Sequence, residues 1–233
     1  MNIKQVFAAL TRFERSLWFG SLVLIVVSFL LSGKPDFWVL TASLIGATAL
    51  ILLARGEPMG QLLSVVFALL YGYISLRFRY YGEMITYLGM TAPMALASLI
   101  SWLRHPFEQG KSQVQVSRVP LARFLLLAGI TGMVTWAFYY ILKFFDTPNL
   151  ALSTVSIATS FLAVGLTYLR SPAYALAYAV NDVVLIGLWV LAGARDPSCI
   201  PMIACFVIFL MNDIYGYYSW RRLAVLQQGM EEI

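Results

Sequence analysis

Runs of about 20 apolar residues, separated by short polar turns, recur along the whole of this chain. An α-helix of about 20 residues is what crosses a hydrocarbon core of about 30 Å. The composition agrees, because 61% of the 233 residues are hydrophobic and only 12% are charged. Soluble domains carry about 25% charged residues. The sequence therefore predicts an all-α polytopic membrane protein whose main surroundings are a lipid bilayer.

Eight segments have the length and apolar content of a membrane span. They cover residues 17–32, 37–54, 61–77, 83–102, 120–142, 149–169, 172–193 and 198–220. Most of the connections are short turns, and the one long loop covers 104–119. The first segment is predicted to be a span rather than a signal peptide, since no A-x-A-like cleavage site follows it.

The basic residues predict the orientation of these spans. Eight spans place both termini on one side, and putting that side in the cytoplasm leaves eleven Lys and Arg residues inside and five outside. The eleven are Lys4, Arg12, Arg15, Arg55, Arg104, Lys111, Arg118, Arg123, Arg170, Arg221 and Arg222. The five are Lys34, Arg77, Arg79, Lys143 and Arg195. Because the basic residues are scattered at helix ends, they indicate membrane orientation and no nucleic-acid partner.

No metal or other cofactor is indicated by the sequence. Cys199 and Cys205 lie six residues apart in the last apolar segment, without metal-type spacing, and are interpreted as packing residues. His105 is the only histidine and lies in the long loop, so histidine-based metal or triad chemistry has no basis. The Gly-rich loop of ATP-hydrolysing proteins is also missing.

Two parts of the chain look like copies of one three-helix unit. Segments two and six both end in a short turn with Arg and Pro, and segments four and eight end in similar Ser-Trp sequences, ISWLR and YSWRR. One intervening span gives both copies the same orientation, a parallel repeat of the SWEET type. The predicted parts are an extra N-terminal helix (1–35), a first bundle (36–103), a cytoplasmic loop and linker helix (104–146), a second bundle (147–221) and a cytoplasmic tail (222–233).

Two Asn-Asp pairs interrupt the last two apolar segments, Asn181-Asp182 and Asn212-Asp213. An ionised carboxylate at the bilayer centre costs about 2.5–3.5 kcal/mol on insertion scales. Such pairs either cross-link helices through hydrogen bonds or line an aqueous substrate site. Asp182 lies near the middle of its segment and is expected to bind the cargo's charge. Asp213 lies nearer the cytoplasmic end and is expected to serve the exit.

Helical spacing places these pairs on stripes with aromatic and hydroxyl side chains, on faces of segments three, four, seven and eight. The predicted substrate-binding residues are Asn181, Asp182, Asn212, Asp213, Tyr178, Tyr174, Trp189, Tyr217, Tyr71, Tyr87 and Thr91. Such a set suits a small, polar, cationic ring compound, through cation–π contacts and hydrogen bonds. Pro93 interrupts the fourth segment, where it forms either a static kink or a hinge for alternating access.

The run ARGEPMGQLLSVVFALLYGYISLRFRYYGEMITYLGMTAPMALASLISW (54–102) resembles the PnuC family of bacterial vitamin transporters. The shared features are the basic-Gly turn, the LYGYIS core, YYGEM, the mid-helix proline and the closing Trp. NDIYGYYSW (212–220) is similar to the family's ending, with Asp213 where that motif often has Asn. Asn181 matches an Asn of the riboside transporters, but Tyr174 and Ala177 replace the two tryptophans that precede it there, and Phe67 replaces the Asn of the first triplet.

This resemblance implies a seven-helix core, made of two three-helix bundles and a linker, in a bacterial plasma membrane. It implies facilitated diffusion of nicotinamide riboside or a related vitamin, which a cytoplasmic kinase then traps by phosphorylation. Transport of thiamine or riboflavin and a proton-coupled carrier are alternatives, and an intramembrane enzyme with paired carboxylates is a remote one. The chain is thus predicted to be a transporter and not an enzyme, with a vitamin or nucleoside as its small-molecule partner; homo-oligomerisation is left open.

Overall fold

The computed structural model describes residues 7–31, 36–108, 112–194 and 200–231. Its helices are α2 (Arg12–Leu31), α3 (Phe37–Ala54), α4 (Pro58–Arg77), α5 (Tyr81–Thr86), the π-helix η1 (Tyr87–Thr91), α6 (Ala92–Arg104), α7 (Leu121–Phe144), α8 (Leu150–Tyr168), α9 (Ala173–Gly193) and α10 (Ile200–Glu231). Segments α5, η1 and α6 run on as one span over Tyr81–Arg104. Within the described residues, eight helices are long and apolar enough to cross a membrane. The predicted fold class is confirmed.

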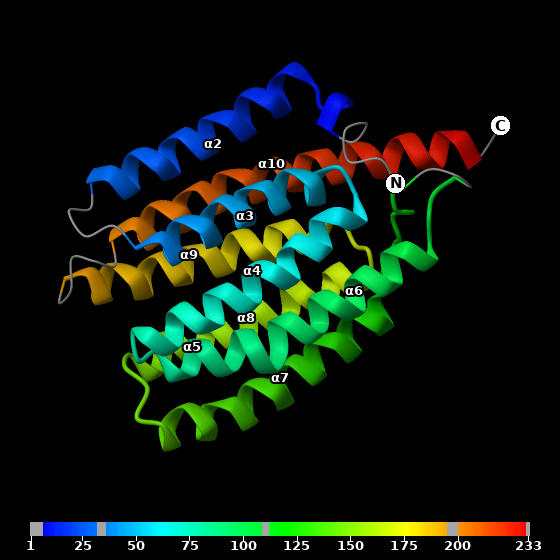
Figure 1. Cartoon of the computed structure of the whole chain (residues 1–233). Helices are drawn as coiled ribbons and strands as arrows, with labels where there is room; N and C mark the ends of the chain where they lie inside the picture. The colour runs from blue at the N-terminus through cyan, green and yellow to red at the C-terminus, as the bar shows by residue number, and fades with distance from the viewer. Residues whose placement is uncertain (1–6, 32–35, 109–111, 195–199, 232–233) are drawn as a thin grey trace.

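Six of the spans form a closed ring. Helices that follow one another around it are in contact, in the order α3, α4, α6, α8, α9, α10 and back to α3. Helix α2 packs outside the ring against α3 and α10, and α7 packs outside it against α8, so the two lie at opposite margins in Figure 1. Helices α2 and α7 carry many exposed large apolar side chains, as expected of surfaces that face lipid.

Reciprocal hydrogen bonds join the two halves of the ring. The indole Nε1 of Trp102, in α6, donates to the Thr167 carbonyl of α8 over 3.0 Å, and that of Trp220, in α10, donates to the Leu53 carbonyl of α3 over 2.7 Å. The preceding serines repeat the exchange, from Ser101 Oγ to the Tyr168 carbonyl and from Ser219 Oγ to the Ala54 carbonyl. Each half thus ties the last helix of its triplet to the first helix of the other.

The carbonyls that accept these bonds precede two turns of the same shape. Gly56, with φ of 71°, follows α3, and Arg170, with φ of 58°, follows α8. Glycine adopts this left-handed conformation at no steric cost, whereas an arginine in it has a steric cost. The shared turn agrees with an internal repeat, although the division of the chain into domains and the SWEET type of bundle stay predictions.

The first and last described residues and the described parts of the long loop lie at one end of the ring, here called the terminal end (Figure 1). There Arg55 Nη1 donates to the Ala9 carbonyl and forms an ion pair of 3.0 Å with Glu14 of α2. The opposite end carries another ion pair, Arg77 with Asp36, at 2.6 Å. This arrangement is the one required by an even number of spans; which end faces the cytoplasm stays a prediction.

Two predicted boundaries were wrong. Helix α2 begins at Arg12, five residues before the predicted first span, because Thr11 and Glu14 form a reciprocal cap at its start. Helix α10 continues through Glu231, so the predicted tail from 222 is helical in its described part. Gln227 fixes this extension, since its side chain bonds the backbone of Val114 and Val116 in the long loop.

Candidate substrate site inside the helix ring

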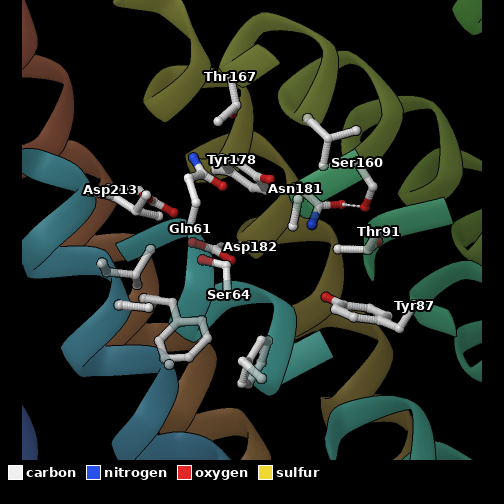
Figure 2. Close-up of a pocket in the computed structure, with 18 of the residues that line it drawn as sticks. Gln61, Ser64, Tyr87, Thr91, Ser160, Thr167, Tyr178, Asn181, Asp182 and Asp213 are labelled. Atoms are coloured by element: carbon white, nitrogen blue, oxygen red, sulfur yellow. Dashed lines mark hydrogen bonds between the residues drawn. The ribbon is translucent and has the colours of Figure 1, made fainter. Parts of the chain in front are cut away.

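A cavity lies inside the ring, and all six helices of the ring line it. Its volume is about 70 Å³, which is room for roughly five water molecules. Figure 2 shows the polar side chains that surround it. They are Gln61 and Ser64 of α4, Tyr87 and Thr91 of η1, Ser160 and Thr167 of α8, Tyr178, Asn181 and Asp182 of α9, and Asp213 of α10.

The carboxyl groups of Asp182 and Asp213 meet in this cavity. They come from adjacent helices, α9 and α10, and lie close enough to share a proton. Both residues are almost fully buried, at 3% and 4% exposure. Within the described residues, Asp182 Oδ2 has no hydrogen-bond partner. Since two ionised carboxylates in contact repel strongly, the pair retains at least one proton.

The amide of Asn181 is oriented by the neighbouring helix α8. Its Oδ1 accepts hydrogen bonds from Thr159 Oγ1 at 2.8 Å and from Ser160 Oγ at 3.0 Å. The bond to Ser160 is visible in Figure 2. With its oxygen occupied, the amide keeps its nitrogen for another acceptor, and no bond from that nitrogen is formed to the described part of the chain. Asn181 thus both joins two helices and presents a donor to the cavity.

A π-helical turn places Tyr87 and Thr91 at the cavity wall. The Ala92 amide donates to the Tyr87 carbonyl, one residue further back than in an α-helix. Pro93 lies directly after this turn and lacks an amide hydrogen. The wider turn therefore forms where the proline removes a hydrogen bond, a feature frequent at functional sites. Thr91 Oγ1 is buried and has no partner within the described residues.

Six of the eleven predicted substrate-binding residues line the cavity: Asn181, Asp182, Asp213, Tyr178, Tyr87 and Thr91. The other five lie away from it. Trp189 donates to Tyr71 Oη at 2.8 Å in a buried aromatic cluster. Tyr174 packs between Trp102 and Trp220.

The remaining two face other neighbours. Asn212 points to α2, where its Nδ2 donates to Ser21 Oγ at 3.1 Å. Tyr217 lies at the terminal end, with the Arg221 guanidinium 5.8 Å from its ring centre. Asp213 shares the cavity with Asp182, and its predicted role in the cytoplasmic exit stays a prediction.

Several cavity residues were missed from the sequence. Gln61 is only 2% exposed, and its Nε2 has no partner among the described residues. Ser160 and Thr167 belong to a row of hydroxyl residues on α8 whose spacing of three and four residues could have been noticed. Glu83 of α5 is buried outside the cavity, toward the opposite end, with Oε2 unpartnered in the described structure. A single acid at a helix start had no distinguishing pattern.

Comparison with known proteins identifies the family of this chain. The family described as nicotinamide mononucleotide transporter matches residues 36–222. The chain belongs to this transporter family. Its resemblance to PnuC proteins is likewise confirmed, and the matches to transporters support the prediction that it is not an enzyme.

Individual relatives agree with this family. The nicotinamide riboside transporter PnuC of Neisseria mucosa is 24% identical, over 97% of this chain and 87% of that protein. PnuC of Haemophilus influenzae is 23% identical over 81% of each chain. A crystal structure described as the vitamin B3 transporter PnuC has the same fold, with a TM-score of 0.82, 22% identity and 94% coverage of both chains. The chain is thus a membrane transporter by its family, and its fold is that of a PnuC protein.

Proposed function

We propose that this membrane transporter carries nicotinamide riboside, or a closely related cationic vitamin, by facilitated diffusion through the ring of six helices. The observation that carries the proposal is the carboxyl pair of Asp182 and Asp213 inside a buried cavity of a PnuC-family protein. Nicotinamide riboside has one permanent positive charge. A carboxyl pair with one shared proton has one negative charge, so cargo and site neutralise each other where a bilayer offers no solvation.

The rest of the cavity suits the other parts of such a cargo. Tyr87, Phe67 and Phe209 provide aromatic surface for a cationic ring. Asn181 and Gln61 provide amides for hydroxyl groups or a carboxamide. Ligand sites commonly measure about 300–1,000 Å³, so the ring must widen from its present 70 Å³ to admit a riboside. The π-turn before Pro93 is a suitable place for that movement.

Equilibration is the test of facilitated diffusion. Purified protein in liposomes should let labelled nicotinamide riboside reach equal concentrations inside and outside, and exchange in both directions, without ATP or a pH gradient. Accumulation that requires an imposed pH gradient would contradict this. Movement of one positive charge through an inside-negative membrane gains about 2.3 kcal/mol per 100 mV, so an imposed potential should concentrate the cation without any proton coupling.

A proton-coupled carrier is the second candidate, because a carboxyl pair can exchange its shared proton for a cation. In that case cargo entry should alkalinise or acidify the liposome interior in proportion to uptake. An internal pH dye distinguishes the two mechanisms: facilitated diffusion moves the cation with no stoichiometric pH change.

In the cell, we place the terminal end in the cytoplasm of a bacterial plasma membrane, in keeping with the charge distribution. Uptake by facilitated diffusion stops at equilibrium, so net import requires that cargo be consumed inside. Phosphorylation by a cytoplasmic kinase would do so, because the added charge prevents return through a site built for a cation. In cells that lack the kinase, the internal concentration of labelled cargo should rise only to the value set by the external concentration and the membrane potential.

A further inference from the structure

A second cavity, of about 990 Å³, lies outside the ring at the terminal end. Three separate parts of the chain enclose it: the loop segment 115–119, the α8–α9 turn with the start of α9, and the extension of α10 beyond Trp220. Two hydrogen bonds hold the walls together. The Ser117 amide donates to the Arg170 carbonyl at 3.0 Å, and Gln227 Oε1 accepts from the Val116 amide at 2.8 Å. The cavity is thus built from packed elements rather than from one exposed loop.

The lining of this cavity is strongly basic. Among the described residues, it includes Arg118, Arg170 and Arg221 and no aspartate or glutamate. In the described ranges none of the three guanidinium groups forms an ion pair. Arg118 is held in place by a bond of 2.6 Å from Nη2 to Gln228 Oε1, and Arg221 lies over the ring of Tyr217. Three positive charges that repel one another around one hollow favour the entry of an anion.

Arg170 is the most informative of the three. Its Nε and Nη1 atoms are buried without a hydrogen-bond partner in the described structure. Burial lowers the pKa of this arginine from its ordinary value, which shows that its charge is poorly solvated. Arg170 also lies three residues before Ala173, the first residue of α9, near the positive end of a helix of 21 residues. A bound anion would supply the missing partner and meet the helix end as well.

We propose that this cavity binds a phosphate ester. The three arginines hold the phosphate group, because guanidinium groups form paired, charge-assisted bonds with phosphate oxygens. The volume exceeds what a bare phosphate needs, and Val116, Val225 and the ring of Tyr217 offer apolar surface for an organic part. Two sources share this chemistry, the headgroup of an anionic phospholipid and a soluble nucleotide, and basic pockets at helix ends are known to suit the former.

The test uses the full chain in nanodiscs and a pair of double variants. Arg118→Gln with Arg221→Gln removes two charges from the cavity, where both side chains are exposed and contribute little to packing. Arg123→Gln with Arg222→Gln is the matched control, because it removes two exposed charges at the same end outside the cavity. Adenosine monophosphate is titrated calorimetrically in phosphatidylcholine nanodiscs, with adenosine as the phosphate-free control. Native mass spectrometry of protein from mixed nanodiscs measures retention of phosphatidylglycerol over phosphatidylcholine.

A soluble ligand is supported if wild-type protein binds adenosine monophosphate, the cavity variant binds it about tenfold more weakly or worse, and the control variant keeps wild-type affinity. Preferential retention of phosphatidylglycerol with the same dependence supports a lipid. Absence of both, or equal losses in the two double variants, overturns the proposal. A third variant, Asp182→Asn/Asp213→Asn, separates this site from cargo binding in the ring. It should behave like wild type in both measurements.

Discussion

The two helix triplets of the ring, α3–α6 and α8–α10, have the same framework but differ in the side chains that they present at corresponding positions of the cavity. Phe67 lies as many residues after Gly56 as Asn181 lies after Arg170, and both side chains line the cavity. Ala95 precedes Trp102 by the same distance as Asp213 precedes Trp220, and these two also line it. The first triplet thus presents apolar groups where the second presents an amide and a carboxyl.

This difference separates what holds the ring from what recognises the cargo. The turns and the reciprocal tryptophan bonds occur in both halves, so they belong to the framework. Both carboxyl groups of the cavity come from the second half. Binding should therefore depend on a few residues of α9 and α10, and stability should depend on both halves alike.

The largest effect on cargo binding is expected when the two carboxyl groups of the second half are removed. The double variant Asp182→Asn/Asp213→Asn removes the negative charge of the pair, and binding of nicotinamide riboside should fall about 100-fold or more. An uncharged riboside analogue of equal size should lose far less. Each single Asn variant leaves one carboxylate, accepting a hydrogen bond from the new amide, and should bind the cation within about tenfold of wild type. Isothermal titration of the purified variants measures all of these.

Equal losses for the charged and the uncharged ligand would mean that the pair supports the helices and does not bind charge. A single variant as weak as the double variant would show that the two groups do not share one charge.

The next effect distinguishes two asparagines of the second half. Asn181→Leu removes the amide donor from the cavity, and binding should fall about tenfold or more. Thr159 also bonds the Val155 carbonyl of its own helix and keeps a partner, so only the bond of the Ser160 hydroxyl is lost and the melting temperature should fall by only a few degrees. Asn212→Leu should give the converse result, near-normal binding with lower stability, because Asn212 holds α2 through Ser21. Binding and thermal unfolding are measured on both; similar losses of affinity in the two would contradict the assigned positions.

The contrast between these asparagines also shows how far the sequence leads. Helical spacing and hydropathy were sufficient for the eight spans, since both depend on local properties of the chain. Spacing also identified one stripe on α9, but a stripe from Tyr174 to Trp189 is about 22 Å long, and the cavity meets only its middle. Which neighbour each part of a stripe contacts depends on tertiary packing. That is why Asn212, which has the same Asn-Asp context as Asn181, was predicted together with it although it lies outside the cavity and contacts Ser21.

A smaller effect tests whether the framework is shared. Trp102→Phe and Trp220→Phe each remove a buried indole donor from a carbonyl, of Thr167 or Leu53, that keeps only a backbone amide as its partner, and the smaller ring fills less of a fully buried site. Each change should cost about 1–3 kcal/mol of unfolding free energy, and the two costs should be similar. Affinity for nicotinamide riboside should stay within about threefold of wild type. Chemical denaturation in detergent gives the free energies, and a large cost in only one half would show that the two ties are not equivalent.

The smallest effect concerns Glu83, a buried carboxyl group of the first triplet. It lies one helical turn before Tyr87, outside the cavity and toward the opposite end of the ring, in a small hollow with Trp189 and Thr147. A buried carboxyl oxygen without a partner destabilises the fold, so Glu83→Gln should raise the melting temperature slightly. If Glu83 attracts the cation on its way to the cavity, the same change should slow uptake into liposomes a few-fold while equilibrium affinity stays unchanged.

Glu57→Gln is a control at the terminal end, where Glu57 accepts a hydrogen bond from Ser112. Slower uptake with unchanged affinity would show that Glu83, and with it the first triplet, takes part in cargo movement. Unchanged uptake would leave charge recognition to the second half alone.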